Sequence, residues 1–285
     1  MEILQLKYFK DAAQTENFSK TAQKFQVPTS AVSQSIRRLE KELGAELFAR
    51  TSNRISLNEE GKLFYRAVCR MDRTLEDTKR LFADRDGELT GEVRMLIACN
   101  RRVVSEAIRQ FSKEHPQVRF TLKHGQAQEE DFDLVISDDL RLKERYTGEP
   151  LITEQIGVAF SAGHSLGQKE TVAVRDLAAE PFVTMHPGGR LHDLTQSLCL
   201  EAGFYPQISI QCDDPYYIRK YIEIGLGVGF VPLFSWRGQL PEGVVCKPLE
   251  GVLRTTYAWW DPSRYMTKAV RGFLEKLQQL CRKEG

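Results

Sequence analysis

The chain has 285 residues, enough for two or three compact domains, and its 41% hydrophobic and 28% charged residues are ordinary for globular proteins. Its longest apolar runs are far shorter than the ~20 residues of a membrane span, and its N-terminus lacks the basic and apolar blocks of an export signal, so we expect a cytoplasmic protein without a membrane partner. No C-x-x-C spacing links the cysteines, which argues against a zinc site and a secreted disulfide framework. The six thiols, expected to be reduced, are Cys69, Cys99, Cys199, Cys212, Cys246 and Cys281.

The net charge of +1 is unevenly distributed along the chain. Residues 1–66 hold 11 Lys and Arg against 8 Asp and Glu, so this part carries +3 and the rest carries −2. The N-terminal part is therefore the candidate for binding nucleic acid. Apolar residues at helical spacing, starting with Ile3, predict a first helix that ends near Glu16 and Asn17. Ser19 is a suitable N-cap for a second helix.

A third helix is predicted from about Thr29 to Leu43, because Val27 and Pro28 break the preceding helix and proline fits a first turn. Its expected core residues are Ala31, Val32, Ile36, Leu39 and Leu43. Its opposite face carries Thr29, Ser30, Ser33, Gln34 and Arg37. Small hydroxyl residues allow close approach to the major groove, and Gln and Arg reach base edges. The spacing predicts a DNA-reading helix-turn-helix; the alternative is a small helical domain with incidental polar faces.

A two-stranded wing is predicted after this helix. Leu47, Phe48 and Arg50 precede a turn at residues 51–53, and the chain returns through Ile55 and Leu57. Arg50 and Arg54 flank the tip of this turn, where a guanidinium can contact phosphate or enter the minor groove.

These segments resemble the N-terminal domain of LysR-type transcriptional regulators. The resemblance lies in FSKTA at 18–22, AVSQSIRRLE at 31–40, LGAELFAR at 43–50 and L-x-x-x-G at 57–61. It implies base reading by Thr29, Ser30, Ser33 and Gln34, backbone contacts by Arg37 and Arg38, and a wing contact by Arg54. The chain has QVPTSAVS where the family more often has serine, glutamine and proline. Because Thr29 cannot make the bidentate contact of glutamine with adenine, a different base preference is expected.

A long helix is predicted from the N-cap Asn58 to about Asp84. Its apolar positions follow a heptad seam formed by Phe64, Val68, Met71, Leu75, Thr78 and Phe82. Such a seam pairs with another helix, or else lies along the chain's own C-terminal domain. The resemblance implies an antiparallel dimer contact in a homodimer or homotetramer, and a contact with RNA polymerase if the protein is an activator. The expected domains are 1–58 (winged helix-turn-helix), 59–88 (linker helix) and 89–285 (effector binding).

Strands and helices alternate from Glu92 onward, which predicts an α/β domain with mostly parallel sheets. The expected strands are 93–98, 118–123, 132–137 and 155–160, with a helix at 103–115. The resemblance implies a two-lobed fold like that of periplasmic binding proteins, with subdomain I at about 92–158 and 254–285 and subdomain II at about 159–251. Few residues separate Gly125 from Phe132, where the family usually has a further helix.

Ligands of such folds bind between the lobes, at strand ends and helix N-termini whose N–H groups favour anions. The candidate effector-binding residues at such places are Asn100, Arg101, His124, Thr184, His186, Gly188, Arg190 and Gly227. MHPGGR at 185–190 favours a carboxylate or another small anion, because its glycines free the backbone and Arg190 adds a positive charge. The alternative is a turn with a surface arginine. His164 is expected to be structural.

Other chemistries have weak support. GLGVG at 225–229 follows a predicted helix at 216–224 and is wrongly spaced for a dinucleotide loop, and G-x-S-x-G, H-E-x-x-H and P-loop motifs are missing. The pairs Asp138–Asp139 and Asp213–Asp214 are expected to be turn residues and helix caps. We therefore expect a DNA-binding regulator that responds to a small-molecule effector, without enzyme activity, cofactor or metal. The alternatives are a redox-sensing regulator that uses Cys199 and Cys212, and a small-molecule-binding protein without DNA function.

Overall fold

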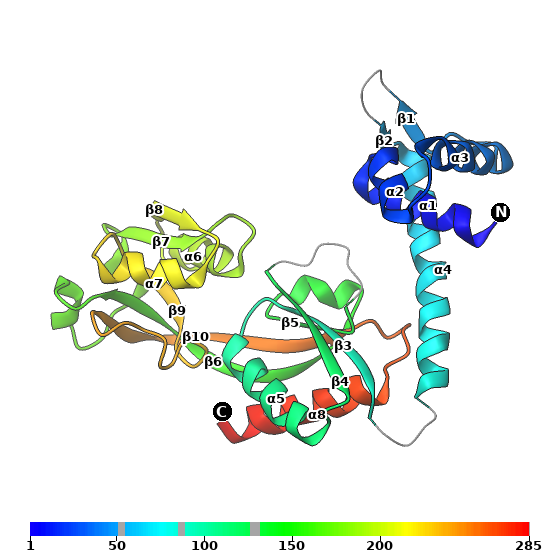
Figure 1. The fold of residues 1–285 in the computed structure, drawn as a ribbon. Helices are drawn as coiled ribbons and strands as arrows, with labels where there is room; N and C mark the ends of the chain where they lie inside the picture. Colours follow the sequence, from blue (N-terminus) through cyan, green and yellow to red (C-terminus); the bar gives the residue numbers. More distant parts are fainter. Residues whose placement is uncertain (51–54, 85–88, 126–131, 285) are drawn as a thin grey trace. The chain divides into compact units, whose positions relative to one another are not determined.

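The computed structural model describes residues 1–50, 55–84, 89–125 and 132–284. The chain divides into two compact units, Met1–Arg85 and Asp86–Gly285, and Figure 1 shows the elements of each. The predicted wing turn at 51–53, Arg54 and the short segment between Gly125 and Phe132 lie outside the described residues.

The first unit contains three helices, a two-stranded wing and a long fourth helix. These elements are α1 (Ile3–Thr15), α2 (Phe18–Phe25), α3 (Thr29–Leu43), β1 (Phe48–Arg50), β2 (Ile55–Leu57) and α4 (Glu59–Ala83). The predicted N-cap of α2 is wrong: the Asn17 side chain, rather than Ser19, accepts hydrogen bonds from the backbone N–H groups of Ser19 and Lys20. Leu43, expected in the core, is instead 37% exposed, because it is the last residue of α3. Ile3, the first apolar residue of the pattern that predicted α1, is 62% exposed at the start of that helix.

The core of this unit is aromatic and includes the start of α4. The Phe9 ring lies 5.7 Å from that of Phe48 and 5.0 Å from that of Phe64 of α4, centroid to centroid. Val68, one turn further along α4, is also buried in this core. The predicted seam therefore has two parts, since Phe64 and Val68 stabilise their own domain. Met71, Leu75 and Phe82 lie further along α4 and are exposed.

The second unit is α/β. Its strands are β3 (Gly91–Ile97), β4 (Val118–His124), β5 (Leu134–Ser137), β6 (Thr147–Ser161), β7 (Pro181–Met185), β8 (Gln207–Cys212), β9 (Gly229–Pro232) and β10 (Val244–Trp260). Its helices are α5 (Arg101–Glu114), α6 (Arg190–Glu201), α7 (Pro215–Glu223) and α8 (Lys268–Glu284), with short 3-10 helices η1 (Leu140–Glu144), η2 (Ser165–Gln168) and η3 (Val174–Leu177).

The main sheet is mixed, which corrects the prediction of mostly parallel sheets. Its strand order is β4-β3-β5-β10-β6-β9, and β3 is parallel to β4 and β5. The other three pairings, made by β10 and β6, are antiparallel. β7 and β8 form a separate parallel pair. The long strands β6 and β10 run through both ends of the unit, with β3, β4, β5, α5 and α8 at one end and β7, β8, β9, α6 and α7 at the other (Figure 1).

These two ends are lobes with separate cores. Ile152 of β6 packs in the first lobe with residues of β3, α5 and α8, whereas Ile156 and Val158 pack in the second. The crossing in β6 thus precedes Ile156, earlier than the predicted boundary at Val158. The β6–β10 register shifts at this place, between Pro248 and Leu253, and Gly251 there has φ 73°. An irregular pairing at the crossing makes this the natural position for bending between the lobes.

Candidate functional site

The exposed face of α3 presents the residues predicted to contact DNA. Thr29, Ser30, Gln34, Arg37 and Arg38 are exposed. Ser33 is half-buried. Arg50 lies at the end of β1, paired with Ile55 of β2, and Arg54 lies outside the described residues.

The opposite face fixes α3 in the unit. Val32, Ile36 and Leu39 have no solvent exposure. The buried Glu40 carboxylate accepts a hydrogen bond from the backbone N–H of Leu47, 3.0 Å away, which connects α3 with the chain that enters the wing. A surface helix with a polar outer face, held rigidly from behind, has the form that major-groove reading requires.

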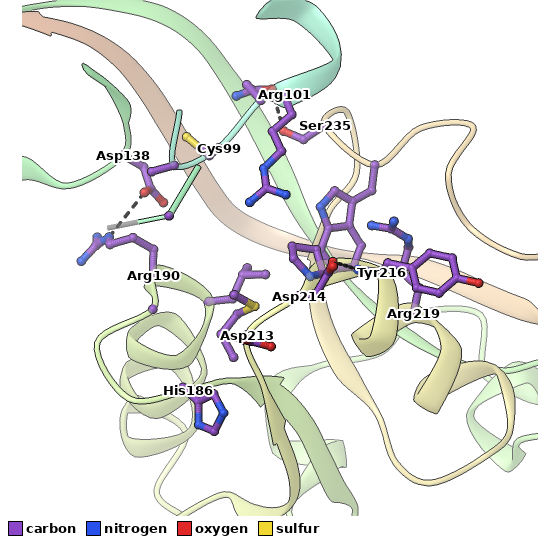
Figure 2. Close-up of a pocket in the computed structure, with 18 of the residues that line it drawn as sticks. Cys99, Arg101, Asp138, His186, Arg190, Asp213, Asp214, Tyr216, Arg219 and Ser235 are labelled. Atoms are coloured by element: carbon purple, nitrogen blue, oxygen red, sulfur yellow. Dashed lines mark hydrogen bonds and ion pairs between the residues drawn. The ribbon is translucent and has the colours of Figure 1, made fainter. Parts of the chain in front are cut away.

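In the second unit, a cavity of about 430 Å³ lies between the lobes. Four of the eight predicted effector-binding residues line it: Asn100 and Arg101 from the first lobe, and His186 and Arg190 from the second. Figure 2 labels Arg101, His186 and Arg190. The volume lies within the range of small-molecule sites.

The other four predicted residues do not line this cavity. Thr184 is buried, with its hydroxyl 3.5 Å from that of Thr195. Gly227 lies against the backbone of β7, where a Cβ atom would be 2.5 Å from the Pro181 carbonyl oxygen. Its role is close packing, because a side chain would not fit there. His124 and Gly188 are exposed, each beside a glycine that does line the cavity, namely Gly125 and Gly189.

Several residues that line the cavity were not predicted to do so, notably Asp138, Tyr216, Arg219, Trp236 and Arg254. Asp138, expected to be a turn residue, is buried and forms ion pairs with Arg190 at 3.5 Å and Arg254 at 3.8 Å. Figure 2 shows the Arg190 side chain directed toward Asp138. The expected capping role holds for Asp139, which caps η1 through the Arg141 backbone N–H, and for Asp214, which caps α7 through the Tyr216 backbone N–H.

Two helices begin at the cavity with uncapped N-termini. In the described structure, neither Asn100 before α5 nor Gly189 before α6 provides a side-chain cap. Asn100 has φ 55°, and its amide instead donates to the Thr256 hydroxyl at 2.6 Å. The partial positive charge of these helix ends adds to that of the lining arginines. The cavity lining thus combines these positive groups with the carboxylates of Asp138, Asp213 and Asp214.

A buried polar network forms the floor of the cavity at the lobe crossing. The Arg254 guanidinium donates to Glu154 Oε1 at 2.6 Å and to the Ser235 hydroxyl at 3.0 Å. The side chains of Arg254 and Glu154 are 9% and 0% exposed. Burial by itself lowers the pKa of Arg254, but Cys99, Glu154 and Asp138 around it outweigh this effect, and the pKa is raised. Arg254 thus remains charged and links the cavity wall with the strands that join the lobes.

The two cysteines of the redox alternative are poorly suited to sensing. Cys199 is fully buried, and burial raises the pKa of its thiol to about 11. Burial also raises the pKa of the Cys212 thiol. Both side chains therefore stay protonated at neutral pH, whereas a reactive cysteine needs thiolate character.

His164, expected to be structural, caps η2. Its Nδ1 accepts a hydrogen bond from the Leu166 backbone N–H, and its ring lies against Phe160. In the described residues, no cluster of His, Cys, Asp and Glu could hold a metal ion, and no helix is long and apolar enough to cross a membrane.

Comparison with known proteins identifies both units. Residues 3–62 match the model of the bacterial regulatory helix-turn-helix protein, lysR family, and residues 86–282 match that of the LysR substrate binding domain. The transcriptional dual regulator GltC of Bacillus subtilis is 28% identical over 295 residues, covering 99% of this chain and 98% of GltC. The HTH-type transcriptional regulator ShiR of Corynebacterium glutamicum is 30% identical, covering 92% of this chain and 94% of ShiR.

Solved structures show the same fold at low identity. Full-length OxyR C199D from Pseudomonas aeruginosa superposes with a TM-score of 0.70 at 20% identity, covering 99% of this chain and 95% of OxyR. Full-length CbnR in complex with its target DNA gives a TM-score of 0.68 at 20% identity, with complete coverage of both chains. The matches confirm the resemblance in both units: the chain belongs to the LysR family of DNA-binding transcriptional regulators with an effector-binding domain.

Proposed function

We propose that operator binding by this regulator is modulated by a small anionic effector in the cavity between the lobes. The observation that carries the proposal is the cavity itself, where Arg101 and Arg190 stand at two uncapped helix N-termini from opposite lobes. Helix ends and guanidinium groups both favour anions, and a site between lobes can report occupancy as a change of shape. The protein acts by binding rather than by catalysis, because its relatives are transcriptional regulators.

The effector must bind one arrangement of the lobes better than the other, since only differential affinity shifts a conformational equilibrium. β6 and β10 connect the lobes, and their irregular pairing between Pro248 and Leu253 allows the angle between the lobes to change. A ligand held by both lobes favours the arrangement in which its two sets of contacts are made together.

Two copies of the chain bind one operator in this proposal. Met71, Leu75 and Phe82 of α4 are 39%, 45% and 56% exposed, whereas the apolar face of a helix is normally covered by another element. Pairing of α4 with its counterpart covers them and places two α3 helices on one partly palindromic site. Thr29, Ser30, Ser33 and Gln34 read bases, while Arg37, Arg38, Arg50 and Arg54 contact the DNA backbone. If the protein is an activator, it also contacts RNA polymerase. As a DNA-binding regulator, it acts in the cytoplasm.

The test uses an operator selected by the full-length protein from random double-stranded DNA. Fluorescence anisotropy then measures the affinity for that operator with and without small carboxylates, sulfonates and phosphates at constant ionic strength. We expect at least one anion to change the operator affinity about fivefold or more, the usual size of allosteric coupling. An operator affinity that no anion changes would contradict the anionic effector.

A further inference from the structure

Two arginines face the cavity from opposite lobes. Arg101 is the first residue of α5 in the first lobe, and Arg219 lies in α7 in the second; both line the cavity. Figure 2 shows the Arg101 side chain extending into the space between the lobes, between Asp138 and Arg190 on the left and Arg219 and Tyr216 on the right.

These two guanidinium groups differ from the other arginines of the cavity in their partners. Arg190 pairs with Asp138 and Asp193, each at 3.5 Å, and Arg254 pairs with Glu154 and Asp138. Within the described residues, neither Arg101 nor Arg219 has a carboxylate oxygen within ion-pair distance. Their positive charge is therefore available to a ligand, whereas that of Arg190 is partly balanced by the carboxylates of Asp138 and Asp193.

The surroundings of Arg219 hold its guanidinium in place without neutralising it. The guanidinium carbon lies 4.9 Å from the centroid of the Trp236 ring, in a cation–π contact. Burial is the largest influence on Arg219 and lowers its pKa; Asp214 opposes this effect, while the nearby charge of Arg101 adds to it. Like charges from two lobes thus repel one another across the cavity, and an anion between them removes the repulsion.

We propose that Arg101 and Arg219 together grip one compact oxyanionic group, a carboxylate, sulfonate or phosphate, and so bridge the two lobes. The ligand class is a small organic anion whose remaining part lies along the wall formed by Tyr216 and Trp236. The bridge rests on the proposed function, to which it adds the pair that recognises the effector. It also assigns the anion contact to Arg101 and Arg219, one from each lobe, rather than to Arg190, which the sequence favoured.

Binding is measured on the full-length protein with three probes: succinate, benzenesulfonate and inorganic phosphate, each against sodium chloride of equal ionic strength. All three tryptophans, Trp236, Trp259 and Trp260, lie in the second unit, so fluorescence-detected melting reports the effector domain. Isothermal titration calorimetry gives the affinity. We expect at least one probe to bind saturably to the wild type and to raise its melting temperature.

The variants Arg101→Gln and Arg219→Gln should each weaken that probe about tenfold or more, as loss of a charge-assisted hydrogen bond does, and the double variant should lose saturable binding. Arg119→Gln, which removes an exposed charge of β4 outside the cavity, should bind as the wild type does. Arg190→Gln should weaken binding less than Arg219→Gln. If Arg219→Gln folds poorly, Arg219→Lys, which keeps the charge but not the planar fork, should still weaken binding.

The bridge is wrong if no probe binds saturably to the wild type, if Arg101→Gln and Arg219→Gln bind as the wild type does, or if Arg190→Gln alone abolishes binding. Operator affinity measured on the same samples separates this result from the proposed function. A probe that needs Arg101 and Arg219 but leaves operator affinity unchanged supports the bridge and refutes effector control. A probe that changes operator affinity equally in wild type and Arg219→Gln supports effector control and refutes the bridge.

Discussion

The substitution Glu154→Gln should strongly destabilise the effector domain. Glu154 has no solvent exposure, and both of its carboxylate oxygens accept hydrogen bonds. Oε1 accepts from Arg254 at 2.6 Å, and Oε2 accepts from the backbone N–H of Ser235 at 2.8 Å. A glutamine side chain offers only one oxygen, so its amide N–H group must point at a donor on one of the two sides.

The magnitude follows from what the substitution leaves behind. Arg254 stays buried, and its nearest remaining carboxylate is Asp138, at 3.8 Å. Breaking a buried ion pair from one side costs about 3–5 kcal/mol, which lowers the melting temperature of a domain of this size by roughly 6–20 °C. Removing both partners in Glu154→Leu with Arg254→Met should cost less than Glu154→Gln alone, because Asp138, which also loses Arg254, keeps its ion pair with Arg190 at 3.5 Å and no buried charge is left alone.

The measurement is urea unfolding of the full-length protein, followed by tryptophan fluorescence, which reports the second unit. Arg109→Met is the matched control: it breaks the exposed pair with Glu106 on α5 and should leave the unfolding midpoint unchanged. A midpoint for Glu154→Gln within error of the wild type would refute the reasoning. So would a double variant less stable than the single one.

Three further outcomes are expected. Asn17→Ala should destabilise the first unit by about 1 kcal/mol through loss of the α2 cap, while Ser19→Ala, which keeps the cap, should cost less. Thermal unfolding followed by circular dichroism compares the two variants, and equal losses of stability would contradict the assignment of the cap to Asn17. Leu75→Glu should weaken self-association in sedimentation experiments while circular dichroism stays native; an unchanged oligomer would mean that α4 pairs elsewhere. Burial raises the pKa of the Cys199 thiol in the folded protein to about 11, from 9.0. The thiol therefore loses its proton first in the unfolded state, so the free energy of unfolding falls as pH rises from 9 to 11. Cys199→Ala should therefore lose less stability than wild type between pH 9 and 11, and parallel pH profiles would contradict this.

The DNA-binding unit was largely predictable from the sequence because its determinants are local. Pro28, the apolar spacing of Val32, Ile36 and Leu39, and the return of the chain at Ile55 define α3 and the wing within 30 residues. The errors arose where two local signals competed. Asn17 and Ser19 both have capping side chains, and only the three-dimensional structure shows that the helix begins at Phe18.

The heptad seam shows how a correct pattern can serve two purposes. Phe64 and Val68 share the spacing of Met71, Leu75 and Phe82, so periodicity alone assigns all five to one interface. The structure separates them, because Phe9 and Phe48, more than ten residues away along the chain, supply a core for the first two. A seam predicts which face of a helix is apolar but not which partner covers each turn.

The cavity was the least predictable part, because its charges are assembled from distant segments. Arg190 stood out in the sequence as a positive charge beside two glycines, and the structure retains it in the cavity wall. The sequence did not show that Asp138, 52 residues earlier, forms an ion pair with Arg190. Arg219 had no local signal at all, since it looks like an ordinary helix-surface arginine until Trp236 and Arg101 are brought beside it. Whether an arginine is available to a ligand therefore depends less on its neighbours in the sequence than on whether it forms an ion pair with a carboxylate in the folded protein.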